Sequence, residues 1–214
     1  CGNESAYLRN RGLAETLARL AGDCSEIAAL DVGCGTGWAL DALKPRRGHA
    51  CDLFDYGTVA KAWQFSCQDA RHLRYESGSF DLVIANLLLM WFPEFDLALG
   101  ELSRVTQPEG RVVIAIMNPY FYRTGAVNES GDFVVCRDLS RPFVIEDHRI
   151  AGSVGPFHYH YRPLPMYLNE CVRAGLWIEE VEDSYINIED FVRHFGSNQP
   201  GNIRRSGKIP MYTF

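Results

Sequence analysis

The sequence predicts an α/β fold, an open, doubly wound, mostly parallel sheet of seven strands, and three observations support it. Short apolar runs alternate with helix-like segments over residues 27–117, and this alternation favours parallel strands joined by right-handed crossovers. A glycine cluster directly follows the first apolar run. Residues 118–162 interrupt the alternation with aromatic residues and turn formers, which indicates an inserted β-rich flap after the fifth strand.

The elements of the first half follow from local patterns. Residues 5–21 carry leucines at helical spacing before Gly22 and predict an opening helix. Short apolar runs predict five strands, at residues 27–32, 48–53, 65–68, 80–85 and 111–117. Helices are expected between them, at residues 38–43, near residues 57–62, and from Pro93 onwards with a stripe of Phe95, Leu99, Leu102 and Val105.

The second half is expected to close the same domain. Strand-like pieces of the flap occur at residues 133–136, 143–149 and 158–161, a helix at 164–174, and strands at 177–182 and 209–214. We therefore expect one domain over residues 1–214. Its parts are the helix of residues 5–22, the ligand-binding core of residues 27–117, the flap of residues 118–162, and a C-terminal part of the core over residues 163–214.

The composition is that of an ordinary globular protein, with 47% hydrophobic and 22% charged residues, which excludes a disordered tail or a fibre. The longest apolar runs fall far short of the ~20 residues needed to cross a bilayer, and the first residues lack a signal-peptide pattern. The net charge is −6 and the basic clusters are short, so DNA or long RNA is disfavoured as a partner.

Seven cysteines are scattered along the chain without a Cys-x-x-Cys pair. This pattern argues against a disulfide framework and against a structural zinc site. Most of these cysteines are expected to be small buried hydrophobes in a reducing compartment. We therefore expect a cytoplasmic protein that holds no metal and does not associate with a membrane.

The glycines at positions 33, 35 and 37 stand where the first strand passes into a helix. Open α/β sheets bind ligands at this carboxyl edge, and glycine lets the backbone approach a ligand closely. A dinucleotide-binding loop would need a further glycine at Trp38, and the Gly-Lys-Ser/Thr sequence of a phosphate-binding loop is absent. The loop therefore predicts a ligand site that is neither a dinucleotide-binding loop nor a phosphate-binding loop.

Three carboxylates lie at strand ends around this loop: Asp31, Asp52 and Asp69. A carboxylate after the second strand can accept hydrogen bonds from both hydroxyls of a ribose. Carboxylates also stabilise a neighbouring sulfonium or amine, whereas they repel a pyrophosphate. Three acids and no basic residue around the loop therefore indicate a cationic nucleoside as the ligand.

These segments are similar to those of class I S-adenosylmethionine-dependent methyltransferases of the small-molecule, type 11 or UbiE-like kind. The similarity covers residues 28–117, and weaker similarity follows at residues 161–164 and 173–176. Its motifs stand at residues 30–37, 51–53, 68–70, 79–83, 101–105 and 107–111. The resemblance implies a Rossmann-like fold, S-adenosylmethionine as the cofactor, and S-adenosylhomocysteine as the product.

The resemblance also implies which residues hold the methionine half of the cofactor. The residues that would frame it are Gly33, Cys34, Gly35 and Gly37. Asp31 would lie near the amino group, and Asn86 would face the methionine part and the transferring methyl group. In the opening helix, Tyr7 or Arg11 would close over the cofactor.

The nucleoside half is assigned in the same way. The resemblance implies that Asp52 holds the ribose hydroxyls and that Leu53 packs on the adenine. The carboxylate of Asp69 would accept the exocyclic amine, and the amide of Ala70 would meet the ring.

Methyl transfer is an in-line displacement, so positioning supplies much of its rate, and a hydroxyl or ammonium nucleophile must also lose a proton. Many similar proteins place His before the Trp of the loop at residues 86–92, but here Met90 precedes Trp91. The candidate bases are therefore His158 and His160, which strand alternation would put on one face. A metal would need a third ligand, which the sequence does not identify. Candidate contacts to the acceptor are Trp91, Tyr120 and Tyr161.

The sequence thus favours a methyltransferase acting on an oxygen or nitrogen of a small-molecule acceptor. The acidic balance disfavours an RNA or protein acceptor, and Trp38 disfavours a nicotinamide-dependent oxidoreductase. Met90 leaves open a scaffold that keeps the fold without turnover. The tripeptide beginning at Asn118 resembles a motif of amino-methylating enzymes, but it follows the fifth strand and lacks the second proline, so we discount it.

Overall fold

The computed structural model describes residues 13–57, 59, 62–120, 124–127, 133–147, 157–187 and 208–214. Its main element is a seven-stranded sheet with the order β10-β11-β5-β4-β1-β2-β3. The strands are β1 (Ala28–Val32), β2 (Arg47–Asp52), β3 (Gln64–Cys67), β4 (Phe80–Asn86), β5 (Thr106–Met117), β10 (Asp183–Asn187) and β11 (Lys208–Thr213).

Five of these strands are parallel neighbours. Strand β1 pairs with β2 and β4, β2 pairs with β3, and β4 pairs with β5. Strand β11 is antiparallel to both β5 and β10. The predicted α/β class with a mostly parallel sheet is therefore confirmed, and the carboxyl ends of β1, β2 and β4 meet at one edge.

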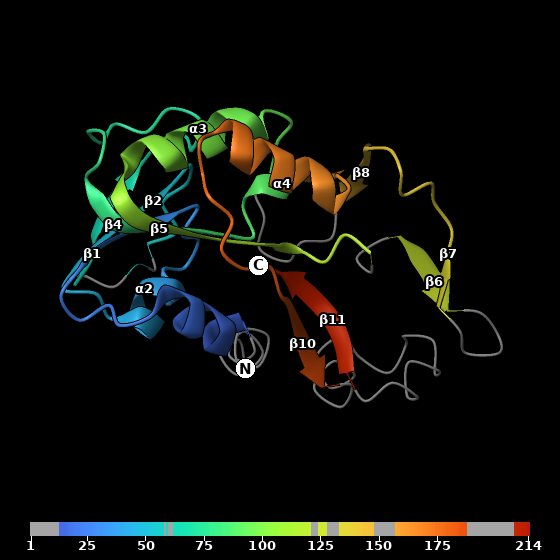
Figure 1. Cartoon of the computed structure of the whole chain (residues 1–214), viewed down its shortest axis with the longest axis horizontal. Coiled ribbons are helices and arrows are strands. Elements are labelled where there is room, and N and C mark those ends of the chain that lie inside the picture. Colours follow the sequence, from blue (N-terminus) through green and yellow to red (C-terminus); the bar gives the residue numbers. More distant parts are fainter. Residues whose placement is uncertain are drawn as a thin grey trace.

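Helices cover both faces of the sheet. A helix over residues 13–21 and α2 (Trp38–Leu43) lie on one face, and α3 (Phe95–Val105) and α4 (Leu164–Arg173) lie on the other (Figure 1). Every residue of β1 is buried, as expected for a central strand covered on both faces. The predicted stripe of α3 is confirmed, because its members are all buried: Phe95, Leu99, Leu102 and Val105.

Two predicted elements near the C-terminal half are wrong. Residues 177–182 form no strand, and the strand lies later, at β10. Trp177 is 88% exposed, and only Glu182 of this segment exchanges backbone hydrogen bonds with the C-terminal segment, through Phe214, the residue after β11. An apolar run without a partner strand does not become a strand. Strand β5 also begins earlier than predicted, with an irregular register opposite Phe80.

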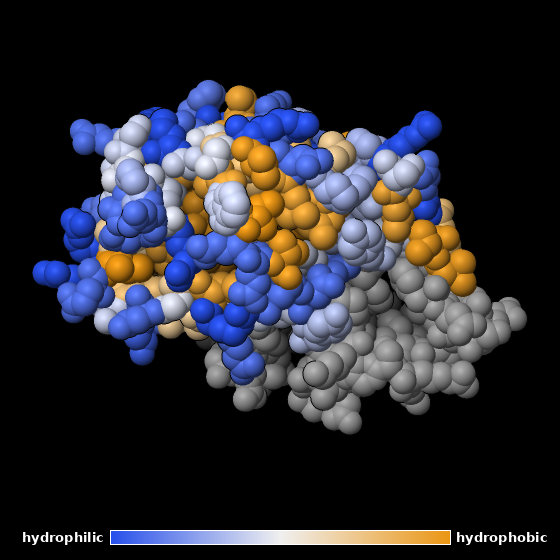
Figure 2. All heavy atoms as spheres, in the orientation of Figure 1, coloured by the Kyte–Doolittle hydropathy of each residue, from blue (hydrophilic) through white to orange (hydrophobic). Residues whose placement is uncertain are grey.

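The flap contains two small antiparallel pairs in the described residues. They are β6 (Gly125–Val127) with β7 (Phe133–Val135), and β8 (Phe143–Asp147) with β9 (Phe157–Tyr161). The helix expected near residues 57–62 lies partly outside the described residues, as does the end of the strand expected at 143–149. Figure 2 shows one apolar group at the centre of this view, over α4, and another over the flap, where Val134 and Val135 are exposed.

Among the described residues, no helix is both long and apolar enough to span a membrane.

Candidate functional site

The glycine loop wraps over the end of β2 through backbone hydrogen bonds. The amides of Gly33 and Cys34 donate to the carbonyl of Cys51 over 2.8 and 3.1 Å. The amide of Gly35 donates to Asp52 Oδ2 over 2.9 Å, and that of Phe54 donates to Asp52 Oδ1 over 3.2 Å. Asp52 therefore holds both the glycine loop and the chain that leaves β2.

Gly33 and Gly35 have φ angles of +70° and +52°, in the left-handed region that favours glycine. A Cβ atom on Gly33 would lie 2.6 Å from Leu88 Cδ1, whereas one on Gly35 would meet nothing within 4 Å. The loop therefore packs tightly against the chain after β4 at Gly33 and leaves open space at Gly35.

This difference predicts unequal costs for two matched substitutions. We expect Gly35→Ala to cost only the left-handed strain, about 1–2 kcal/mol of unfolding free energy, and Gly33→Ala to cost more, because it also displaces Leu88. Urea unfolding of the ligand-free chain measures both values. The double variant Gly33→Ala/Leu88→Ala should recover part of the difference, and equal costs for the two single variants would contradict the packing argument.

Two buried acceptors at the carboxyl ends of β1 and β4 have no hydrogen-bond partner among the described residues: Asp31 Oδ1 and Asn86 Oδ1. Asp31 stands in β1, 1% exposed, and its register partner in β4 is Ile84, two residues before Asn86. Buried acceptors normally have a donor. This pair therefore fits a ligand that brings hydrogen-bond donors, such as an ammonium group.

Burial, with a smaller contribution from the nearby Asp52, raises the pKa of Asp31 to about 7. The free carboxyl is therefore about half protonated at neutral pH. In the ligand-free chain this group favours folding below pH 4, and that contribution is lost as the pH rises through 7, because the folded state binds its proton more tightly than the unfolded state.

We expect a ligand that carries an ammonium group to bind the ionised form of Asp31. Its affinity should then fall as the pH drops below 7, and binding at pH 6 should release about one proton. Calorimetric titration with S-adenosylhomocysteine in two buffers of different ionisation enthalpy measures this release. Asp31→Asn should bind more weakly and without the release; an unchanged release in that variant would assign the proton to another group.

Beyond Asp52, the chain presents three exposed apolar side chains: Leu53, Phe54 and Tyr56, with exposures of 58%, 47% and 43%. The Phe54 and Tyr56 rings meet edge to face at 6.4 Å. Exposed aromatic and aliphatic side chains next to a carboxylate suit a nucleoside. The base can stack on these side chains while the ribose hydroxyls donate hydrogen bonds to the carboxylate.

Asp69 stands after β3, with its carboxylate bound by Arg71. The Arg71 guanidinium lies 2.6 Å from Asp69 Oδ2 and 2.8 Å from Glu94 Oε2, and its hydrogen bonds lower the pKa of Asp69. The neighbouring Ala70 is buried. Sequence reasoning missed Arg71 and Glu94. The Asp-x-Arg spacing could have indicated the first pair, but nothing local links Arg71 to Glu94.

Cys34 is buried in the loop, and this burial is the main cause that raises the pKa of its thiol. A neutral, buried thiol is no nucleophile at neutral pH. Cys34 therefore contributes its backbone amide to the loop and small volume to the core.

The flap histidines occupy one face of β9, as their spacing predicts. His158 is exposed and His160 is partly buried, while the intervening Tyr159 and the following Tyr161 are buried in the core. Burial, with a smaller contribution from Arg162, lowers the pKa of His160. The imidazole of His160 is therefore mainly uncharged at neutral pH.

The three candidate acceptor contacts lie in different environments. The indole of Trp91 donates to the Leu87 carbonyl over 2.6 Å, and its ring meets Tyr159 edge to face at 6.0 Å. Tyr161 is fully buried and donates its hydroxyl to the Leu139 carbonyl. Tyr120 is 52% exposed. In the described conformation, Trp91 and Tyr120 have surface that a ligand can reach and Tyr161 has none.

Arg162 joins the flap to the loop between β4 and α3. Its side chain is buried and donates to three carbonyls of that loop, at distances of 3.1, 2.7 and 2.9 Å: Leu89, Phe92 and Pro93. The guanidinium also lies 4.2 Å from the centre of the Phe95 ring. The weak similarity at residues 161–164 was the only signal in the sequence that pointed to this residue.

Two further expectations concern residues outside this cluster. Tyr7 and Arg11 lie outside the described residues. Asn118 is buried and donates to Asp183 and Thr213, so it ties β5 to the two C-terminal strands. This contact gives Asn118 a structural role, in agreement with the prediction that its tripeptide is not a catalytic motif.

Among the described residues, no three metal-ligating side chains converge.

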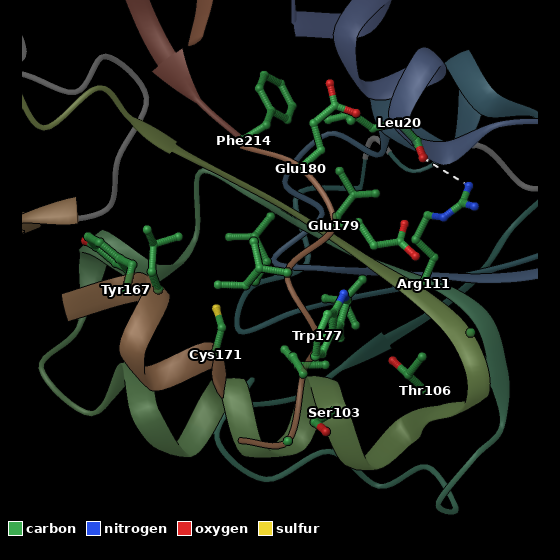
Figure 3. Close-up of a pocket in the computed structure, with 18 of the residues that line it drawn as sticks. Leu20, Ser103, Thr106, Arg111, Tyr167, Cys171, Trp177, Glu179, Glu180 and Phe214 are labelled. Atoms are coloured by element: carbon green, nitrogen blue, oxygen red, sulfur yellow. Dashed lines mark hydrogen bonds between the residues drawn. The ribbon is translucent and has the colours of Figure 1, made fainter. Parts of the chain in front are cut away.

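A large cavity of about 1140 Å³ lies elsewhere, against β5, α4 and residues 175–181 (Figure 3). None of the glycines or carboxylates described above lines it. The ligand edge of the sheet and this cavity are therefore separate features.

Comparison with known proteins finds similar proteins for the part of the chain that carries this site. A family model described as a methyltransferase domain matches residues 30–114, which carry the glycine loop, Asp52, Asp69 and Asn86. A structure of an S-adenosylmethionine-dependent methyltransferase from Mesorhizobium loti matches with a TM-score of 0.72 and 18% identity, covering 96% of this chain and 97% of that one. Residues 30–114 therefore match a methyltransferase domain, and the chain has the fold of this S-adenosylmethionine-dependent methyltransferase.

Two further proteins match this chain. A malonyl-[acyl-carrier protein] O-methyltransferase of Halorhodospira halophila is 38% identical over 142 residues, which are 59% of this chain and 48% of that protein. The chain thus spans about half the length of this curated relative. The [4+2]-cyclase SpnF shares the fold, with a TM-score of 0.59 and 18% identity over 94% of this chain and 77% of that one.

Proposed function

We propose that the chain transfers the methyl group of S-adenosylmethionine to a carboxylate oxygen of a malonyl thioester or a similar acceptor. The observation that carries this proposal is the loop from Leu87 to Pro93, which reads Leu-Leu-Leu-Met-Trp-Phe-Pro and contains no titratable side chain. A carboxylate is already anionic at neutral pH and needs no base. The O-methyltransferase relative names an acceptor of this kind.

When bound, S-adenosylmethionine supplies an electrophilic methyl group on a cationic sulfur. The chain's residues would position it: Asp31 and Asn86 accept hydrogen bonds from the ammonium group, and Asp52 accepts them from the ribose hydroxyls. Asp69 would accept from the adenine amine with its orientation fixed by Arg71. Leu53 would pack on the base. Such positioning supplies a large part of the rate of a displacement.

The apolar loop would contribute by removing water from the acceptor carboxylate. Met90 is 1% exposed and lies in the core, and the Trp91 ring packs edge to face against Tyr159 of the flap. Attraction between the carboxylate and the cationic sulfonium grows as the effective dielectric constant falls. An apolar wall therefore suits a reaction between opposite charges.

A hydroxyl or amine acceptor is the alternative, and it would need a base. Its candidates are His158 and His160, of which His160 is favoured by its uncharged imidazole. The two proposals separate in one pair of variants. With a carboxylate acceptor, His160→Ala and His158→Ala should each retain more than about half of the activity, whereas loss of a general base costs about 10²–10⁴-fold.

The proposal is tested by measuring S-adenosylhomocysteine formation with a malonyl thioester, on coenzyme A and on an acyl carrier protein. The matched control is the same thioester with its carboxyl already methylated, and a phenol and an amine complete the panel. Turnover of only the free-carboxyl thioesters supports the proposal, and the preferred carrier shows whether the acceptor is small or protein-bound. Turnover of only the phenol or amine would overturn it. A folded chain that binds the cofactor but methylates nothing would point to another reaction on this fold.

A further inference from the structure

Arg71 binds two carboxylates that come from different connections of the sheet. Its main-chain amide and Nε each donate to Asp69 Oδ1 over 2.9 Å, and Nη2 donates to Asp69 Oδ2 over 2.6 Å. The other arm of the guanidinium, Nη1, donates to Glu94 Oε2 over 2.8 Å. One planar side chain therefore joins the turn after β3 to the residue that precedes α3.

Glu94 binds this guanidinium instead of its own helix. It is the N-cap residue of α3, where side-chain acceptors commonly bind the first free amides of a helix, but its side chain makes no such hydrogen bond. A hydrogen bond from its own backbone amide, and then one from Arg71, lower the pKa of Glu94. The carboxylate is therefore charged at neutral pH and directed to Arg71.

The same guanidinium lies against the end of the loop of residues 87–93, here called the acceptor loop. Its Cζ atom is 5.8 Å from the centre of the Phe92 ring, within the range of a cation–π contact. Arg162 of the flap donates to the main-chain carbonyls of Phe92 and Pro93. Two arginines thus hold the end of the acceptor loop, one beside Asp69 and one from the flap.

We propose that Arg71 is a positioning residue that couples the cofactor site to the acceptor loop, so that binding of the adenine amine at Asp69 makes the loop more rigid. This inference rests on the proposed function, in which Asp69 accepts the amine and the loop contacts the acceptor. The amine would fix Asp69, Asp69 would fix the guanidinium, and the guanidinium would fix Glu94. An acceptor that needs an ordered loop would then lose less conformational entropy on binding, and this coupling acts equally in both directions.

The exposure of this network favours a role in positioning over a role in stability. The side chains of Arg71, Asp69 and Glu94 are 33%, 32% and 45% exposed, and ion pairs at such exposure contribute little to the free energy of unfolding. Arg104 differs, because it is also 33% exposed but donates to the main-chain carbonyls of Leu73 and Tyr75 and so anchors a turn. The side chain of Arg71 donates to carboxylates instead.

Hydrogen exchange at the amide of Trp91 tests the coupling without any acceptor. This amide lies in the acceptor loop and donates to the Leu88 carbonyl over 3.1 Å, so its exchange rate reports opening of the loop. We expect saturating S-adenosylhomocysteine to slow this exchange at least about fivefold in the parent chain and less than about twofold in Glu94→Ala. Because the open loop is a minor state, Glu94→Ala should bind S-adenosylhomocysteine within about twofold of the parent affinity.

Two further variants complete the test. Arg71→Met removes both contacts, so it should lose the effect on Trp91 and also bind S-adenosylhomocysteine more weakly, because Asp69 loses its support. The matched control is Glu26→Ala. This change removes an exposed ion pair, to Arg46 at 3.4 Å, at the opposite end of β1 from the glycine loop. We expect Glu26→Ala to show the parent's slowing at Trp91.

Slowing of the parent's size in Glu94→Ala would overturn the proposal, even if this variant exchanged faster both with and without S-adenosylhomocysteine, since that pattern would leave Glu94 a structural role alone. A parent chain that does not bind S-adenosylhomocysteine would overturn both the proposal and the cofactor assignment. Malonyl-coenzyme A tests the proposed acceptor separately. It should strengthen S-adenosylhomocysteine binding in the parent and not in Glu94→Ala. An unchanged parent affinity would contradict the acceptor, while the exchange ratio at Trp91 would still decide the coupling.

Discussion

Asp52→Ala is expected to weaken the binding of S-adenosylhomocysteine about 100-fold, close to 2.7 kcal/mol. The carboxylate has two roles that this change removes together. It holds the amides of Gly35 and Phe54 in the free chain, and we propose that it accepts the ribose hydroxyls in the complex. Hydrogen bonds to a charged group contribute about 1.5–3 kcal/mol each, so the expected loss in binding free energy is slightly smaller than the sum for two such bonds. Calorimetric titration measures it.

A matched control is Asp23→Ala. Asp23 also accepts a backbone amide with its carboxylate, that of Ser25 at 2.9 Å, but it precedes β1, at the opposite end of the strand from the glycine loop. We expect this variant to bind the cofactor as the parent does. Parent-like affinity in Asp52→Ala would contradict the assignment of the ribose site, and a loss in both variants would indicate general destabilisation.

Arg162→Met is expected to lower the free energy of unfolding by about 3 kcal/mol or more. The substitution leaves the carbonyls of Leu89, Phe92 and Pro93 without their charged donor, and a buried polar group without a partner costs about 1–3 kcal/mol. It also removes the contact with the Phe95 ring. Methionine keeps most of the volume, so the effect reports hydrogen bonding more than packing. Urea unfolding with an unchanged m-value measures it.

Arg173→Met is the control for this change. Arg173 lies on the neighbouring helix α4 with its side chain 68% exposed and one ion pair, to Glu170 at 2.7 Å. Exposed ion pairs contribute about 0–1 kcal/mol, so this variant should unfold nearly as the parent does. Similar losses in the two arginine variants would show that the carbonyl contacts of Arg162 contribute little.

The central sheet could be predicted from the sequence because its signals are local. The most buried strands, β1 and β4, are short and mainly apolar runs, and the turn that follows β1 is marked by glycines that adopt left-handed angles. The placement of Asp31 and Asp52 at one edge then follows from parallel pairing. These inferences need only the alternation of elements, and no knowledge of which distant side chains meet.

The contacts that the sequence did not indicate are long-range. Arg71 and Glu94 are 23 residues apart, and Arg162 reaches Leu89 across 73 residues. No periodicity links such pairs. The mistaken strand at residues 177–182 has a related cause, since a strand exists only with a hydrogen-bonded neighbour. Among the described residues, only Glu182 of this segment has such a neighbour, Phe214, and Trp177 is 88% exposed.

The contacts of Arg162 have a consequence for how this domain can diversify. Its three acceptors in the loop are main-chain carbonyls, which every amino acid carries. The arginine therefore holds this backbone whichever side chains the loop carries. Leu89 and Met90 belong to the core, so the positions that can vary are the partly exposed ones, Trp91 and Phe92. Under the proposed function, point substitutions at these two positions would alter acceptor preference and preserve the loop's attachment to the flap.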